Sequence, residues 1–130
     1  MNLNKSTGYG LIAVCYIAKN QEQKIILTSE ISEKYDISLE FLQKIMLQLT
    51  KSNTLRSKRG PKGGFSLGKP ADKISMLEII EAVEGPMAGN LYISEQAPNE
   101  KFCIKFEKAY GKGIDQAKAV LEKIKLSEML

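Results

Sequence analysis

The chain has 130 residues, of which 43% are hydrophobic, and this is the size of one ordinary folded domain. No apolar run approaches the roughly 20 residues of a membrane span, and the first twenty residues combine Lys5 and Lys19 with a broken apolar pattern unlike a secretion signal. These features argue against a membrane partner and predict a soluble, cytoplasmic protein. Its two cysteines, Cys15 and Cys103, are then expected to be reduced thiols.

The net charge of +4 is unevenly distributed. Residues 1–71 carry 11 basic and 5 acidic groups, whereas residues 72–130 carry 8 and 10. Between Lys51 and Ala71 there are six Lys or Arg residues and no acidic one, which favours a polyanionic partner such as duplex DNA. The chain has no histidine, the commonest general base, so we expect no enzyme activity.

The first half of the chain predicts three helices. Apolar residues at steps of three and four predict a first helix that ends near Lys19, and they are Tyr9, Ile12, Ala13, Tyr16 and Ile17. Thr28 is predicted to cap a short second helix, which Asp36 closes. Ser38 is predicted to cap a third helix, and the second and third helices have helix-turn-helix spacing.

The third helix is predicted to have a buried and an outward face. The buried stripe consists of Leu39, Leu42, Ile45, Met46 and Leu49. The outward face mixes polar groups of both signs and consists of Glu40, Lys44, Leu47, Gln48 and Lys51.

A β-hairpin with a cationic tip is predicted after the third helix. Its two strands are Leu55 to Lys58 and Gly64 to Leu67. Between them stand Arg59, two glycines that permit positive φ, a proline that fixes φ, and Lys62.

The second half of the chain predicts further helices. Ser75 and Glu78 form a capping box for a fourth helix that stops at Gly85. Residues 87–99 are predicted to form a loop, in which the only apolar patch is residues 91–93. A stripe of Phe102, Phe106 and Tyr110 follows, which Gly111 to Gly113 are predicted to interrupt. The last helix is predicted to pair with a partner helix through Ile114, Ala117, Leu121 and Ile124.

Helices followed by a basic hairpin predict a winged helix-turn-helix, and several stretches of the sequence support a named family. The stretches STGYGLIAVCYIAKN, ISEKYDISLEFLQKIMLQLTKSNTLRSKRGP, RGPKGGFSLGKP, MLEIIEAVEGP and KLSEML resemble the Rrf-two family of bacterial transcription regulators. The resemblance covers nearly the whole chain. It implies a mainly α fold with a small hairpin wing, and a homodimer held by a long C-terminal helix that binds operator DNA. The implied divisions are residues 1–86 for DNA binding, 87–99 as a loop and possible effector region, and 100–130 for dimerisation.

The resemblance and the helix pattern together point to specific DNA contacts on the third helix. The predicted major-groove residues are Ser38, Glu40, Phe41, Gln43 and Lys44. Glu40 is suited to cytosine, Gln43 to adenine and Phe41 to a thymine methyl, whereas periodicity alone also allows a solvated face, or a core contact for Phe41. The family's iron-sulfur cluster regulator has Tyr and Glu where this chain has Phe41 and Gln43. The operator sequence of that regulator therefore cannot be assumed for this chain.

Arg59 at the wing tip is the residue that we expect to matter most. A guanidinium is narrow, permanently charged and weakly hydrated, which suits insertion into a minor groove narrowed by A·T-rich sequence. Arg56, Lys58 and Lys62 are predicted to contact phosphates. The alternative is that the tip is merely a solubilising basic loop.

The sequence says less about which residues would detect a regulatory signal. Cluster-binding members of the family carry three closely spaced cysteines before the last long helix, whereas this chain has only Cys103 there, so no iron-sulfur cluster is expected. A cluster that bridges the dimer through Cys103 is one alternative, and a redox or persulfide sensor is a second. The third alternative is that Cys103 packs beside the stripe that contains Phe102 and Phe106. Packing is the commonest role of a lone cysteine. A small ligand between residues 87–99 and the dimer helices is a further hypothesis.

The sequence thus predicts a DNA-binding transcriptional regulator, a repressor that binds a palindromic operator as a homodimer and responds to an unidentified effector. The alternative is a protein- or RNA-binding adaptor built on the same scaffold. The stretch from Gly63 to Lys69 matches the body of a phosphate-binding loop, but Pro70 stands where the magnesium-binding Ser or Thr is required. A nucleotide hydrolase is therefore not expected.

Overall fold

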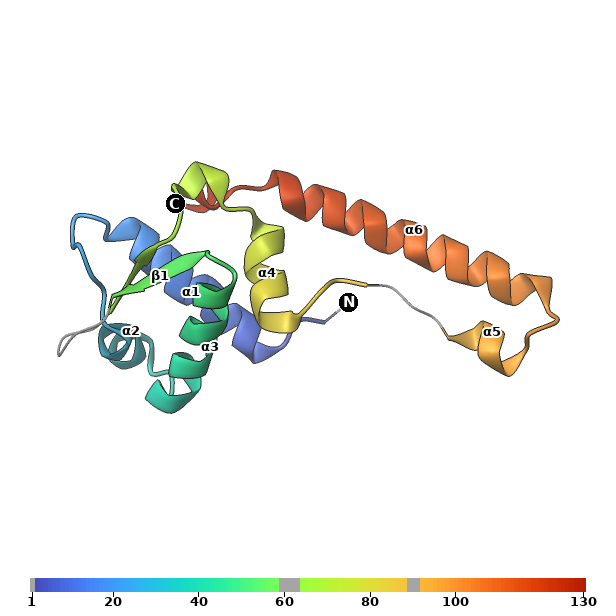
Figure 1. The fold of residues 1–130 in the computed structure, drawn as a ribbon, viewed down its shortest axis with the longest axis horizontal. Coiled ribbons are helices and arrows are strands. Elements are labelled where there is room, and N and C mark those ends of the chain that lie inside the picture. The colour runs from blue at the N-terminus through green and yellow to red at the C-terminus, as the bar shows by residue number, and fades with distance from the viewer. Residues whose placement is uncertain (1, 59–63, 89–91) are drawn as a thin grey trace.

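The computed structural model describes residues 2–58, 64–88 and 92–130 (Figure 1). Its longer elements are α1 (Lys5–Lys19), α2 (Thr28–Tyr35), α3 (Leu39–Lys51), β1 (Leu55–Lys58), β2 (Gly64–Leu67), α4 (Met76–Glu84), α5 (Ile93–Gln96) and α6 (Lys101–Lys123). Two short 3-10 helices, η1 (Ala71–Lys73) and η2 (Leu126–Met129), complete the order. The predicted mainly α fold with a two-stranded hairpin and a long C-terminal helix is confirmed.

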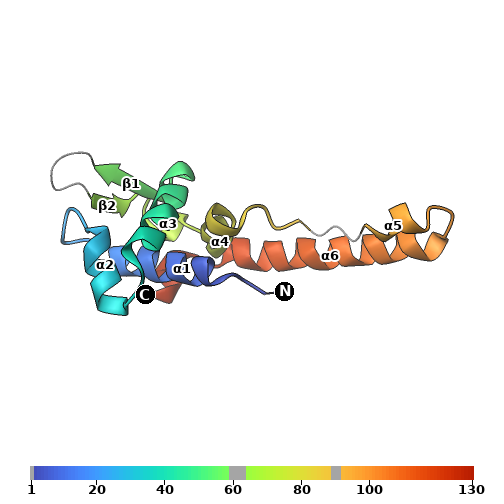
Figure 2. The same ribbon diagram turned by 90° about the horizontal axis from the view of Figure 1, so that it is seen from below.

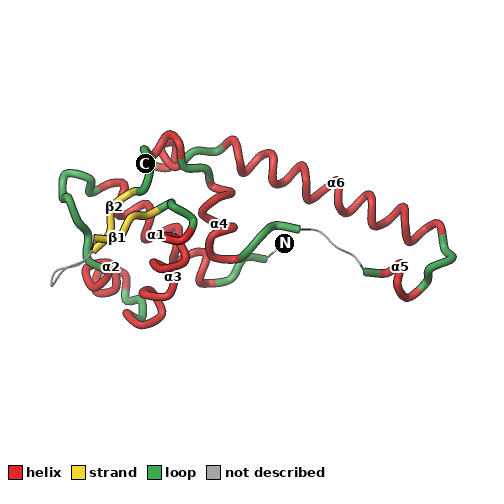
Figure 3. Tube along the Cα trace, viewed as in Figure 1, coloured by secondary structure: helices red, strands yellow, loops and turns green. Residues whose placement is uncertain are grey.

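The molecule has a compact part and a long arm, which consists of α5 and α6. Helices α1 to α4 and the hairpin form the compact part, and Figure 2 shows the hairpin and α2 together at the end farthest from α5. After α4 the chain reaches α5 at the tip of the arm, and α6 brings it back (Figures 1 and 3). Within residues 2–58, 64–88 and 92–130, no helix combines the length and the apolar character of a membrane span.

The hydrophobic core lies between α1, α3 and α4 in the compact part. It includes Val14 and Ile17 of α1, Ile45 and Leu49 of α3, and Ile79 of α4. Leu126 of η2 is also fully buried in this core. Backbone hydrogen bonds from Leu126 to Ile74 (2.8 Å) and from Met76 to Ile124 (2.8 Å) hold the chain's last residues there. The segment that runs from α4 through α6 is thus attached to one core at both of its ends.

The helix boundaries follow the sequence closely in the helix-turn-helix. Asp36 closes α2 in the left-handed conformation (φ 53°), as its position predicts. Ser38 caps α3 by accepting a hydrogen bond from the Phe41 N–H (3.4 Å). The prediction that Thr28 caps α2 is wrong by one residue: the cap is Leu27, whose N–H donates to the Glu30 carboxylate (3.1 Å). The first-turn carboxylate of Glu30 thus satisfies the backbone N–H of the cap residue, although no hydroxyl stands at the cap.

The arm differs from the sequence prediction in two places. The predicted loop of residues 87–99 contains the short helix α5, because the Glu107 carboxylate accepts hydrogen bonds from both the N–H (2.9 Å) and the hydroxyl (2.7 Å) of Ser94. These bonds lower the pKa of Glu107 below its ordinary value. The predicted interruption at Gly111 to Gly113 is also wrong, because α6 runs unbroken through it. Glycine weakens a helix by about 1 kcal/mol but removes no hydrogen bond, so a 23-residue helix tolerates it.

Glu78 joins three segments at the base of the hairpin. Its carboxylate accepts hydrogen bonds from the Ser75 N–H (3.1 Å) in the predicted capping box and from the buried Thr54 hydroxyl (3.2 Å) before β1. It also forms a salt bridge with Lys69 after β2 (2.7 Å). The start of α4 is thus tied to both legs of the hairpin.

We expect Glu78→Ala to lower the free energy of unfolding by about 1–3 kcal/mol, because hydrogen bonds to a charged, partly buried group are lost, including the half of the capping box that the carboxylate forms. Urea titration followed by circular dichroism measures this change. Asp72→Ala is the matched control, since Asp72 is exposed and makes no hydrogen bond or ion pair with any described residue. Equal stability of the two variants would contradict the role of Glu78.

Candidate nucleic-acid interface

The outward face of α3 is open to solvent, as the sequence predicts. The predicted base-reading residues Ser38, Glu40, Phe41, Gln43 and Lys44 are all exposed. Leu42, Ile45, Met46 and Leu49 are buried and fix the helix against α1 and α4. The helix can therefore present its N-terminal half to a partner without loss of core packing.

Phe41 combines the two roles that the sequence left open. Its ring packs edge-on against Tyr9 of α1, with 5.8 Å between the ring centroids. The side chain nevertheless remains exposed and lines a surface groove with Lys44, Gln48 and Lys51. Contact with α1 thus orients Phe41 while one side of its ring stays accessible.

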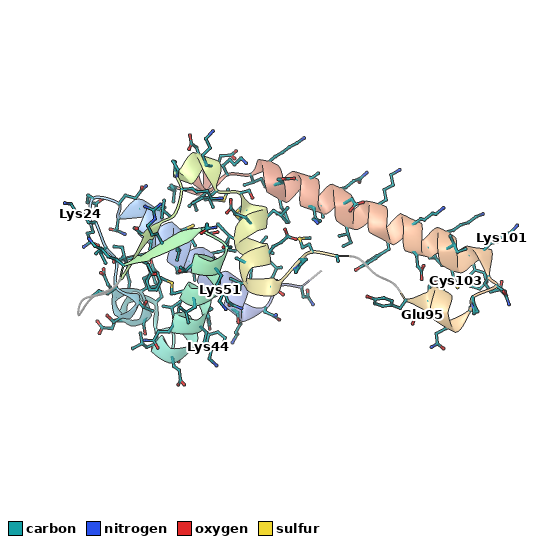
Figure 4. All side chains as sticks on the ribbon, viewed as in Figure 1. Lys24, Lys44, Lys51, Glu95, Lys101 and Cys103 are labelled. Atoms are coloured by element: carbon teal, nitrogen blue, oxygen red, sulfur yellow. The ribbon has the colours of Figure 1, made fainter. Side chains whose placement is uncertain are left out.

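Four cations stand near this face without an acidic partner. Among the described residues, Lys44 and Lys51 of α3 and Arg56 and Lys58 of β1 form no ion pair, and all four are exposed. Figure 4 shows Lys44 and Lys51 on α3, and Lys24 on the loop that leads to α2. Free cations on one surface give the positive potential that attracts a phosphate backbone.

The wing is held in place by backbone contacts on both sides. In the antiparallel hairpin Leu55 pairs with Leu67, and Phe65 exchanges two backbone hydrogen bonds with Ile26 (2.8 and 2.9 Å). A Cβ at Gly64 would overlap Ile25 and the Ile26 carbonyl, and one at Gly68 would overlap the Asn53 carbonyl. These glycines are therefore required for packing. The predicted tip residues Arg59 and Lys62 lie outside the described residues.

The apparent phosphate-binding loop has a structural explanation. Residues 64–67 form β2 rather than a loop before a helix, and Lys69 is paired with Glu78 (2.7 Å). Gly63 lies outside the described residues. The lysine that a nucleotide would need is thus already engaged.

Sequence reasoning missed an apolar groove beside α3. Leu39, predicted to be buried, is 42% exposed, because it lies in the first turn of α3 beyond the edge of the core. With Gln43, Leu47, Phe65 and Leu27 it lines a groove of about 470 Å³ between α3, the start of α2 and β2. The only feature of the sequence that pointed to this groove was Leu47, which lies on an otherwise polar face of α3.

The two cysteines lie in different environments. Burial raises the pKa of the Cys15 thiol in α1, and nearby Lys19 only partly offsets this effect, so its thiolate is disfavoured at neutral pH. Cys103 is 1% exposed and lies in α6 beside α5, at the opposite end of the molecule from α2 (Figure 4). Its burial supports the packing interpretation.

Comparison with known proteins agrees with the geometry of α3 and the wing. The profile of the Rrf2 (Rrf-two) family, described as iron-dependent transcriptional regulators, matches residues 3–130. The chain belongs to the Rrf2 family. Regulators of this family are DNA-binding proteins that typically act as dimers, and they are not enzymes.

Individual relatives are bacterial proteins. The transcriptional regulator IscR of Cronobacter sakazakii is 37% identical over 84 residues (65% of this chain and 52% of that protein). IscR of Cereibacter sphaeroides is 34% identical over 86 residues (65% and 56%). The chain thus spans about half the length of the curated relatives it matches. The structure of CymR, the global cysteine regulator of B. subtilis, has the same fold (TM-score 0.81, 22% identity, 99% of this chain and 95% of that one).

The family's description names iron, and the residues of this chain do not fit iron held as an iron-sulfur cluster, as in IscR relatives. A cluster is held by about four ligands, chiefly thiolates, with histidine as the usual replacement. The chain has two cysteines and no histidine, and Cys15 is in α1 whereas Cys103 is near the tip of the arm. In the described ranges no three His, Cys, Asp or Glu side chains gather as metal ligands would.

We expect Gly68→Ala to destabilise the protein by about 1–3 kcal/mol, because the new methyl group must displace the Asn53 backbone at the base of the wing. Gly8→Ala in α1 is the control. No atom lies within 4 Å of a Cβ there, and replacement of a helical glycine should stabilise by roughly 0.5–1 kcal/mol. Thermal unfolding measures both changes, and effects of the same sign would contradict the packing role of Gly68.

Proposed function

We propose that this Rrf2-family chain is a homodimeric repressor that binds a palindromic, partly A·T-rich operator. The observation that carries the proposal is the unpaired set of Lys44, Lys51, Arg56 and Lys58 around an open α3 face. Residues 1–86 bind DNA, residues 87–99 form the effector region and residues 100–130 form the dimer. A dimer with half-sites about one helical turn apart presents two copies of α3 to successive major grooves.

The contacts are divided between bases and phosphates. Glu40, Phe41 and Gln43 read base edges, and Ser38 and Lys44 contact bases or phosphates at the groove edge. Arg56, Lys58 and Lys62 contact phosphates, which makes binding sensitive to salt. Arg59 enters the minor groove beside the site read by α3.

The dimer forms through an apolar seam on α6. Phe106, Tyr110, Gly113, Ala117 and Val120 recur at alternating steps of four and three, which places them on one face of the helix. Phe106 is 59% exposed and Val120 60% exposed in the single chain. The small residues Gly113 and Ala117 stand at the middle of the seam, where two helices could approach closely.

Two of the residues predicted from sequence to form the dimer lie on another side of α6. Ile114 lines a cavity with Ile80 of α4, and Lys118 pairs with Glu81 of α4 (3.9 Å). Leu121, one turn beyond Ala117, is half-buried on this inner side. Ala117 belongs to the outer seam, whereas Ile124 follows the end of α6 in an extended conformation and its carbonyl accepts a hydrogen bond from Met76. The proposed interface therefore keeps one of the four residues and adds Phe106, Tyr110 and Val120.

We propose that regulation does not use a cluster. The buried Cys103 becomes reactive only if α5 moves from α6, since thiol oxidation requires access. A small effector has a candidate site in the cavity of about 170 Å³ that Met87, Ala88, Tyr110 and Ile114 line beside the N-terminal segment. A ligand there would contact both the arm and α4.

We expect iron-free protein to enrich an inverted repeat from a pool of random duplexes. Arg59→Ala should then weaken binding to the selected operator by ~1–3 kcal/mol, the scale of one base contact. Fluorescence anisotropy over a range of salt concentrations measures the loss. No enrichment over bulk DNA would favour the adaptor function, a requirement for iron would contradict cluster-free regulation, and an Arg59→Ala variant that binds as tightly as wild type would refute the wing contact.

We expect Phe106→Asp to convert the dimer into monomers, because it places a charge at the centre of the apolar seam. Ile104→Asp is the matched control, since Ile104 is exposed on the same helix but lies on the opposite side from Phe106. Sedimentation equilibrium measures the mass of each. Dimerisation by both variants, or by neither, would refute the proposed seam.

A further inference from the structure

An apolar groove adjoins the lysine-bearing groove of the candidate interface, and the two grooves share Leu47. Its apolar walls are Leu39 and Leu47 of α3, Leu27 before α2, and Phe65 of β2. Gln43 lies between the two α3 leucines, and Thr28 and Ser29 at the start of α2 complete the lining. Leu47 is 58% exposed and Leu39 is 42% exposed. Exposed leucines gain free energy when a partner covers them, at roughly 25 cal/mol per Å² of buried apolar surface.

The groove is built on fixed elements. Leu39, Gln43 and Leu47 are four residues apart and therefore form one row along α3. The facing wall is positioned by the two backbone hydrogen bonds between Ile26 and Phe65 (2.8 and 2.9 Å). The groove thus exists before any partner binds, and it opens on the side of α3 where the predicted base reader Gln43 lies.

Charge complementarity restricts what can occupy this groove. No charged residue lines it, but Lys44 and Lys51 line the adjoining groove on the same helix, and Lys58 lies on the neighbouring strand. These three cations outnumber the exposed Glu40 of α3, and none of them has an acidic partner among the described residues. These cations favour DNA over an uncharged apolar peptide. In the major groove the apolar group that DNA offers to a protein is the 5-methyl group of thymine.

We propose that this groove binds thymine methyl groups, and that Leu39 and Leu47 are specificity-determining residues for the operator. The inference rests on the DNA binding proposed above and adds to it. Gln43 can pair with adenine N6 and N7 while the leucines on either side contact methyl groups of the same or adjacent base pairs. The row therefore selects A·T pairs in the major groove.

The test uses the selected operator with each thymine replaced in turn by deoxyuridine, which keeps base pairing and lacks only the methyl group. Wild-type protein should lose about fourfold in affinity at each thymine that contacts the groove, or about fifteenfold when both symmetric half-sites are changed, from about 0.8 kcal/mol per buried methyl. Fluorescence anisotropy at fixed salt measures the ratio of the two dissociation constants.

Leu39→Ala and Leu47→Ala should reduce this thymine-to-uracil ratio towards one. Ile12→Ala, which truncates an exposed aliphatic side chain of α1 outside the groove, should keep the wild-type ratio. The proposal is wrong if deoxyuridine has no effect, if both leucine variants discriminate as well as wild type, or if the selected half-site contains no thymine. The first two results would leave operator binding itself intact, whereas failure to select any operator would remove both proposals.

Discussion

The Glu78 carboxylate is the interaction on which the arrangement of the interface depends. It accepts hydrogen bonds from Thr54 before β1 and from the cap of α4, and it pairs with Lys69 after β2. Because α4 packs against α3 through the core, this side chain helps to fix the hairpin relative to α3, together with the backbone hydrogen bonds between Ile26 and Phe65. The close approach of Gly68 to Asn53 adds a steric constraint at the same place. The minor-groove contact proposed for the wing would depend on this base.

The arm is built as a two-sided helix. One side of α6 packs against α4 near the compact part and holds α5 near the tip, through Glu81 with Lys118 and Glu107 with Ser94. The other side carries Phe106 and Val120, which the single chain leaves exposed, and Tyr110 lies between the two sides, since it also lines the cavity beside α4. Since Leu126 returns to the core beside α4, the arm is attached to the compact part at both of its ends.

The proposed interface uses polar and apolar readout side by side. Unpaired cations attract the backbone without regard to sequence, and Glu40 and Gln43 have the hydrogen-bonding groups that distinguish bases. The groove between Leu39 and Leu47 would add discrimination that carries no charge and so is insensitive to salt. Such a division lets affinity and specificity be set by different residues of one helix.

Local sequence patterns determined much of this protein. The caps at Ser38 and Ser75, the stop at Gly85 and the outward face of α3 are set by interactions within a few residues, and all were predicted correctly. Tertiary structure decided the rest. Leu39 is exposed because the core ends before it, residues 93–96 are helical because Glu107 binds Ser94 from another helix, and Ile114 faces inward because α4 lies beside it. Periodicity identifies an apolar face, but only the packed chain shows which neighbour covers that face, because contacts between distant segments leave no trace in local spacing.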